Sequence, residues 1–252
     1  MAARRRGRHA SAMGRSLTAA VASWLRRLAS SLSPIDIGLF ARSARTDGAI
    51  ARLRPSIGQR EAFESVYRAL GDPWASASRR YLYQRRKYEE ILAFLPEQRF
   101  GRVLDLGCGL GLLSTRLAER ADSVLGLDIA EAAVEAARLR ARHLGNISFH
   151  QGDIQELSTT FDGQFDLVVI ADTLYYLPPP LHDALLKSIV ARVADLLAPG
   201  GLCVLANHYF FSGDASSRVS RRIHNAFSWS PRFQVMREDA FPFFLVSVLA
   251  VC

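Results

Sequence analysis

The sequence has few cysteines, and their spacing excludes the common cysteine-based sites. Its 252 residues include only three, Cys108, Cys203 and Cys252, which lie far apart and form an odd set. A zinc site needs closely spaced ligand pairs, and a complete disulfide framework needs an even number of cysteines. We therefore expect free thiols, no metal site and a location in the reducing cytoplasm.

Long apolar runs are also missing. A membrane-spanning helix needs roughly 18 to 20 consecutive apolar residues. The longest candidate, residues 243–251, has the length of a strand and is interrupted by Ser247. The sequence therefore predicts no membrane span, and its 49% hydrophobic content is ample for one α/β domain.

Acidic residues are nearly absent from the first 60 positions. This segment holds 12 arginines but only Asp36 and Asp47, so its formal charge is +10, against +8 for the whole chain. The remaining residues are slightly acidic. Because the positive charge belongs to the N-terminal segment, it does not indicate a catalytic domain that binds nucleic acid, and we expect no nucleic-acid partner.

Apolar residues between Met13 and Leu32 recur at intervals of three or four, with arginines elsewhere on the helical wheel. This pattern is typical of an amphipathic helix. It is compatible with an organelle transit peptide, with weak contact of residues 1–32 with an anionic membrane, or with an extension of no function. We expect a disordered or weakly helical extension at residues 1–55, lid helices at 56–100 and a core at 101–252.

A glycine-rich turn follows an apolar run at residues 103–111. Gly107, Gly109 and Gly111 alternate with other residues, and apolar residues at helical spacing follow them. Glycine allows positive φ and lets a ligand lie against the backbone, while a helix N-terminus offers unpaired N–H groups. The pattern predicts a strand, a turn and a helix that receive a small molecule.

Two carboxylates distinguish this turn from a dinucleotide-binding one. Asp105 lies two residues before the first glycine, where it would repel a pyrophosphate but would suit a cationic ligand. Asp128 lies at the end of the next apolar run. A carboxylate in that place can accept both hydroxyls of a ribose.

In order and spacing, five segments resemble the class I S-adenosylmethionine-dependent methyltransferases. They are residues 103–111, the strand end at Asp128, and residues 151–154, 165–169 and 197–201. The resemblance covers about residues 84–252. It implies an α/β fold, with a doubly wound, Rossmann-like sheet of seven strands that ends in an antiparallel hairpin, and it implies S-adenosyl-L-methionine as the cofactor.

Under this resemblance, the cofactor-binding residues follow the strand ends. They are Asp105, Leu106, Gly107, Cys108, Gly109, Asp128, Ile129, Asp153, Ile154 and Asp172. In the family, an acid at the position of Asp153 accepts a hydrogen bond from the adenine amino group, and the next apolar residue packs on the ring. The alternative is that Asp153 caps a short helix beginning at Ile154.

A narrower resemblance is to the nodulation N-methyltransferase (NodS-like) family. It rests on Asp72-Pro73-Trp74, Tyr81, Arg86-Lys87-Tyr88-Glu89, Ile91-Leu92 and Asp172-Thr173-Leu174-Tyr175-Tyr176-Leu177-Pro178. The family methylates a free glucosamine nitrogen on a chitin-oligosaccharide signal, which implies N-methylation of a small amine-bearing acceptor here. It often has glutamate at the position of Asp172 and lacks the basic tail. Trp74 and Tyr88 are equally compatible with ordinary packing.

Methyl transfer from a sulfonium requires alignment of the acceptor and exclusion of water, and an amine acceptor must also lose a proton. The candidates for this proton transfer are Asp172, Tyr175 and His208. Asp172 and His208 are expected to leave adjacent strands at the ligand edge. For His208 a purely structural role at a strand end is the alternative.

Two other functions stay open at this point. One is a small-molecule O-methyltransferase of natural-product metabolism. The other is an inert cofactor-binding module that docks through its basic tail, although the intact Asp105, Gly107, Gly109 and Asp128 favour an enzyme. The sequence after the fourth expected strand is unlike the Asn-Pro-Pro-Tyr tetrad of enzymes that methylate adenine or glutamine.

Overall fold

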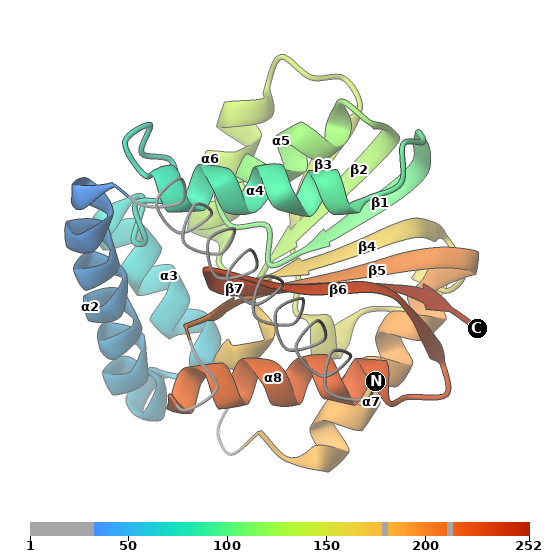
Figure 1. Ribbon diagram of the computed structural model, residues 1–252. Helices are drawn as coiled ribbons and strands as arrows, with labels where there is room; N and C mark the ends of the chain where they lie inside the picture. Colours follow the sequence, from blue (N-terminus) through green and yellow to red (C-terminus); the bar gives the residue numbers. More distant parts are fainter. Residues whose placement is uncertain (1–32, 178–180, 211–213) are drawn as a thin grey trace, which may run out of the picture.

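A computed structural model describes residues 33–177, 181–210 and 214–252. One sheet of seven strands lies between layers of helices (Figure 1). The strands are β1 (Phe100–Leu106), β2 (Ala121–Asp128), β3 (Ile147–Gln151), β4 (Phe165–Ala171), β5 (Leu197–Tyr209), β6 (Phe233–Phe241) and β7 (Phe243–Val251). The α-helices are α2 (Pro34–Ile57), α3 (Gln59–Leu70), α4 (Leu82–Phe94), α5 (Leu112–Ala118), α6 (Glu131–Ala141), α7 (Asp183–Leu196) and α8 (Ala215–Ser228). None of the described helices is both long and apolar enough to cross a membrane.

The strand order is β3-β2-β1-β4-β5-β7-β6. Strands β1 to β5 are parallel, whereas β7 is antiparallel to both β5 and β6. The order changes direction between β1 and β4, and in doubly wound sheets ligands bind at the carboxyl ends of the strands at such a point. The seven-stranded α/β fold with an antiparallel C-terminal hairpin, expected from the sequence, is confirmed.

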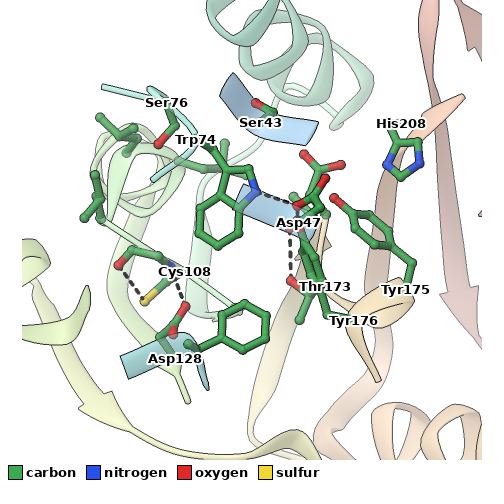
Figure 2. Close-up of a pocket in the computed structure, with 18 of the residues that line it drawn as sticks. Ser43, Asp47, Trp74, Ser76, Cys108, Asp128, Thr173, Tyr175, Tyr176 and His208 are labelled. Atoms are coloured by element: carbon green, nitrogen blue, oxygen red, sulfur yellow. Dashed lines mark hydrogen bonds between the residues drawn. The ribbon is translucent and has the colours of Figure 1, made fainter. Parts of the chain in front are cut away.

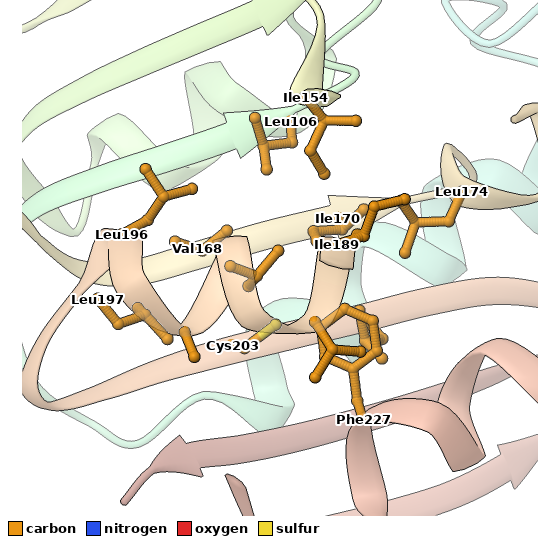
Figure 3. Packing of buried hydrophobic residues seen from close by; sticks show 14 of the residues in the cluster. Leu106, Ile154, Val168, Ile170, Leu174, Ile189, Leu196, Leu197, Cys203 and Phe227 are labelled. Carbon is orange, nitrogen blue, oxygen red and sulfur yellow. The ribbon is translucent and has the colours of Figure 1, made fainter. Parts of the chain in front are cut away.

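Both faces of the sheet are buried because side chains alternate along each strand. Val103 of β1 packs in a cluster with residues of α4 and α5, while Leu104 and Leu106 point to the opposite face. On that opposite face, Ile189 and Leu196 of α7 and Phe227 of α8 cover the strands (Figure 3). The central strands therefore sit in a rigid core, and their carboxyl ends are held in fixed positions.

Helix α8 packs against the sheet through Ile223 and Phe227, which are fully buried. His224 on the same helix is also buried and hydrogen-bonds Ser247 and Asn207 at 2.6 and 3.0 Å. Burial lowers the pKa of His224 to about 3, so the imidazole is neutral at physiological pH. Helix α8 is therefore a structural helix of the core.

Helix α2 differs from the expected extension at residues 1–55. Asp36 near its start is fully buried and accepts hydrogen bonds from the backbone N–H groups of Ser33 and Leu82 at 2.6 and 3.0 Å. Thr46 donates to the Pro73 carbonyl at 2.8 Å, and Ile50 is buried against α3. Hydrogen bonds to residues far away in the sequence therefore stabilise a helix whose own residues show no clear apolar periodicity. The amphipathic helix expected at residues 13–32 lies outside the described residues.

We predict that α2 is required for stability. A chain that begins at Gly58 loses the buried Ile50 and the bonds of Asp36 and Thr46, so its free energy of unfolding should fall by roughly 3 kcal/mol or more. Urea denaturation followed by circular dichroism measures this difference. The matched control begins at Ser33 and retains α2; equal midpoints for the two chains would contradict the prediction.

Candidate active site

A cavity of about 610 Å³ opens at the carboxyl ends of the parallel strands. Helices α2, α3 and α4 contribute to its walls together with the glycine turn after β1 (Figure 2). Every site residue expected from the sequence lines it. They are Asp105, Leu106, Gly107, Cys108, Gly109, Asp128, Ile129, Asp153, Ile154, Asp172, Tyr175 and His208.

The glycine turn is fixed by backbone contacts to β2. Gly107 and Cys108 donate their N–H groups to the Leu127 carbonyl at 2.7 and 2.9 Å. Gly107 has φ 76°, and a Cβ on it would collide with the hydroxyl of Thr173. This position therefore requires glycine both for its conformation and for its close approach to the loop after β4.

Two buried carboxylates flank this turn. Asp105 is 2% exposed and accepts a 2.5 Å hydrogen bond from the Ser114 hydroxyl. Asp128 accepts from the N–H groups of Gly109 and Ala130 at 2.8 and 3.0 Å, one on each oxygen. Burial raises the pKa of both carboxyls to about 6. Since each Asp128 oxygen has further lone pairs, the side chain can still accept two hydroxyl groups.

Asp153 serves the structural role that the sequence left open. Its Oδ1 accepts from the Gln155 N–H at 2.9 Å and so caps the short 3₁₀ helix η1 (Ile154–Glu156). The residue also lines the cavity, and Ile154 beside it is buried there. Contact of Asp153 with a cofactor remains a prediction.

Asp172 follows β4 with an unusual backbone. Its φ is 53°, a left-handed value that costs a non-glycine residue energy and is frequent at functional sites. One carboxylate oxygen, Oδ2, forms an ion pair with the ammonium of Lys87 on α4, which is 2% exposed. The other, Oδ1, is buried without a hydrogen-bond partner in the described part of the chain. An ion pair with a buried lysine thus helps to hold this backbone conformation.

Lys87 belongs to a motif of the NodS-like resemblance but was not predicted as a site residue. A signal for it exists in α4, where Tyr83, Lys87 and Ile91 are separated by four residues and are all buried. A lone cation on a buried helical face needs an anionic partner. The pattern therefore predicts that a partner exists, but not that it is Asp172.

Tyr175 and His208 meet edge to face, with ring centroids 4.5 Å apart. Burial raises the pKa of Tyr175 well above its usual value, so the phenol stays protonated. Burial lowers the pKa of His208, although the nearby charge of Asp172 opposes this, so the imidazole is largely neutral at pH 7. Of these two side chains only His208 can accept a proton under neutral conditions.

The two aromatic residues whose role the sequence left open both line the cavity. Trp74 donates its indole N–H to Asp47 of α2 at 2.9 Å and contacts the rings of Tyr67 and Tyr176. Tyr88 lines the same space. Asp47 had not been considered as a site residue, since it falls in the segment interpreted as an extension.

The charged side chains that line the cavity are mostly acidic. Among the described lining residues, they are Asp47, Asp105, Asp128, Asp153 and Asp172 against one cation, Lys87. Such a cavity has a negative potential and suits a cationic ligand. In the described residues, no group of three His, Cys, Asp or Glu side chains is arranged to hold a metal ion.

Comparison with protein families gives one match, in which residues 103–201 fit a family described as a methyltransferase domain. Among curated relatives, a ubiquinone biosynthesis O-methyltransferase of Acinetobacter baylyi is 36% identical over 113 residues, which are 44% of this chain and 42% of that protein. A trans-aconitate 2-methyltransferase of Deinococcus radiodurans is 41% identical over 124 residues, 47% of this chain and 43% of that protein. The chain thus matches less than half the length of these relatives.

Solved structures extend the similarity over more of the chain. The N-methyltransferase NodS from Bradyrhizobium japonicum WM9, in complex with S-adenosyl-L-homocysteine, has a TM-score of 0.64 and 22% identity, and the match covers 75% of this chain and 97% of NodS. A protein from Pyrococcus horikoshii OT3 has a TM-score of 0.60 and 21% identity, and the match covers 75% of this chain and 100% of that protein. Residues 103–201 therefore match a methyltransferase domain, and the chain has the fold of the class I S-adenosylmethionine-dependent methyltransferases and resembles NodS.

Proposed function

We propose that the protein transfers a methyl group from S-adenosyl-L-methionine to the nitrogen of a small amine-bearing acceptor, such as an amino sugar or a chitin oligosaccharide with a free amine. The observation that carries this proposal is the composition of the cavity. One space joins the glycine turn and Asp128 to Asp172 and His208, and five carboxylates against one cation line it. Both a sulfonium donor and an amine acceptor are favoured by such a field.

The residues present fit the methyl donor. Asp128 has a free lone pair on each oxygen for the two ribose hydroxyls, and Asp153 and Ile154, to which the family resemblance assigns adenine contact, line the same cavity. The backbone of Gly107 and Gly109 provides a surface without side chains. When bound, the donor supplies a methyl group already activated by positive sulfur.

The protein must then remove a proton from an acceptor ammonium. His208 is the base that suits this step, since it is neutral and lies at the end of β5 beside the loop after β4. Asp172 contributes a carboxylate oxygen, Oδ1, that has no partner in the described part of the chain, and its pairing with Lys87 fixes its position. Tyr175 keeps its proton and supports the imidazole ring.

Asp128→Ala should weaken S-adenosyl-L-homocysteine binding by roughly ten- to a hundredfold, because hydrogen bonds to a charged group contribute about 1.5–3 kcal/mol. Isothermal titration calorimetry measures the affinity. Asp122→Ala is the matched control, since Asp122 lies on the same strand but is exposed and pairs with Arg99. An unchanged affinity of Asp128→Ala would refute the ribose assignment.

A screen with tritiated methyl donor should give transfer to glucosamine or to chitin oligomers with one free amine, and none to their N-acetylated forms. Mass spectrometry of the product should locate the methyl group on nitrogen. A product methylated on oxygen would favour the O-methyltransferase alternative, which agrees with the activity named for the Acinetobacter relative. Donor binding without turnover of any acceptor would favour an inert binding module.

His208→Gln should lower kcat/KM at pH 7 by roughly 10²- to 10⁴-fold if the imidazole accepts the proton. The pKa of His208 is lowered, so the wild-type base is neutral from about its usual pKa of 6.5 upward and loses activity only as pH falls below that range. The variant should lack this acidic limb. Its deficit should shrink as pH approaches the pKa of the acceptor amine, where solvent supplies the neutral nucleophile.

The companion variants concern Asp172. Asp172→Asn leaves Lys87 buried without its anion, which costs about 3–5 kcal/mol in comparable buried pairs. The double variant Asp172→Asn with Lys87→Met removes both charges and should recover much of that stability. If its rate remains low while its stability recovers, the negative charge of Asp172 serves the reaction. A fast double variant would assign Asp172 to pairing alone, and an unaltered rate in His208→Gln would exclude the imidazole as base.

A further inference from the structure

Helix α2 supplies one wall of the cavity through side chains spaced three or four residues apart. Phe40, Ser43, Ala44 and Asp47 all line it. The helix is fixed beside the cavity, since Arg42 donates to the Asp72 carbonyl at 2.5 Å and Arg54 donates to the Tyr176 carbonyl at 3.1 Å. The wall is therefore a built part of the site.

The Asp47 carboxylate is held by two neutral donors. Its Oδ1 accepts from the Trp74 indole at 2.9 Å and from the Tyr176 hydroxyl at 2.6 Å (Figure 2). Burial raises the pKa of Tyr176 well above its usual value, so this hydroxyl keeps its proton and remains a donor. Both bonds end on the same oxygen, and Oδ2 has no hydrogen-bond partner among the described residues.

Among the described residues, no cation forms an ion pair with this carboxylate. Asp172 in the same cavity is neutralised by Lys87, and Asp105 and Asp128 are buried with backbone or hydroxyl donors. Asp47 is instead an exposed residue, oriented but without an ion pair in the described part of the chain, at the edge of an aromatic cluster.

We propose that Asp47 is a specificity-determining residue that binds a primary ammonium group inside the cavity. The free Oδ2 supplies a charge-assisted hydrogen bond, in a cavity that the rings of Trp74 and Tyr176 also line. Two ligands carry such a group, namely the amino-acid end of the methyl donor and the amine of the acceptor. This identification of the ligands rests on the proposed function.

Asp47→Asn is the informative variant. Its amide oxygen can still accept from Trp74 and Tyr176, so the local geometry is kept while the charge is removed. Asp122→Asn, an exposed residue at the other end of β2 from the cavity, controls for loss of one negative charge. Urea midpoints should agree for all three proteins.

The donor is tested by calorimetric titration with S-adenosyl-L-homocysteine and with 5′-methylthioadenosine, which lacks the amino-acid end. If Asp47 binds the donor ammonium, Asp47→Asn should lower the affinity for S-adenosyl-L-homocysteine by roughly ten- to a hundredfold. The affinity for 5′-methylthioadenosine should stay unchanged. An equal loss of affinity for both ligands would show that the substitution disturbs the cavity, and would count against the proposal.

The acceptor is tested by titrating the S-adenosyl-L-homocysteine complex with glucosamine and with glucose. If Asp47 binds the acceptor ammonium, wild type should prefer glucosamine and Asp47→Asn should lose that preference. The proposal is overturned if the variant matches wild type for both S-adenosyl-L-homocysteine and glucosamine. If no acceptor is methylated in the screen but Asp47→Asn still loses affinity for an ammonium ligand, the proposed function is rejected and the ammonium site is retained.

Discussion

The close approach of the turn after β1 to the loop after β4 is the constraint on which the site depends. Gly107 donates to the Leu127 carbonyl of β2, while the Thr173 hydroxyl donates to the Leu106 carbonyl at 3.0 Å. A side chain at Gly107 would separate these segments. Because both contacts occur where the strand order changes direction, one small backbone turn sets the distance between the donor side of the cavity and the side that carries Asp172.

Features encoded over a few residues were predictable from the sequence. Glycine spacing, strand-end aspartates and alternating apolar runs gave the sheet and all of the expected lining residues, since a parallel strand places its carboxyl end at a common edge. The pairing of Lys87 with Asp172 and the folding of α2 depend on contacts between segments far apart in the sequence. Local periodicity contains no information about such partners, and α2 in particular is stabilised by polar anchors such as Asp36.

The carboxylates of the cavity are separated into different chemical states by their surroundings. Burial raises the pKa of Asp105 and Asp128 to about 6, and a buried lysine neutralises Asp172. Asp47 is exposed, accepts from two neutral donors and has no ion pair among the described residues. A uniform cluster of anions would repel itself, whereas here Asp105 and Asp128 accept hydrogen bonds from hydroxyl and backbone donors and Asp172 pairs with Lys87 of α4.

The same arrangement explains why the fold alone does not determine the atom that is methylated. A neutral imidazole such as His208 can accept a proton from an ammonium or from a hydroxyl, so the base is compatible with either acceptor. Relatives with this domain include a named O-methyltransferase, and the similar fold of NodS belongs to an N-methyltransferase. A preference for an amine over a hydroxyl acceptor must then come from groups that interact with the positive charge of the acceptor before it loses its proton. Asp47, on the wall that α2 supplies, fits such a role under the proposal above, because an ammonium gains from its field and a neutral hydroxyl does not.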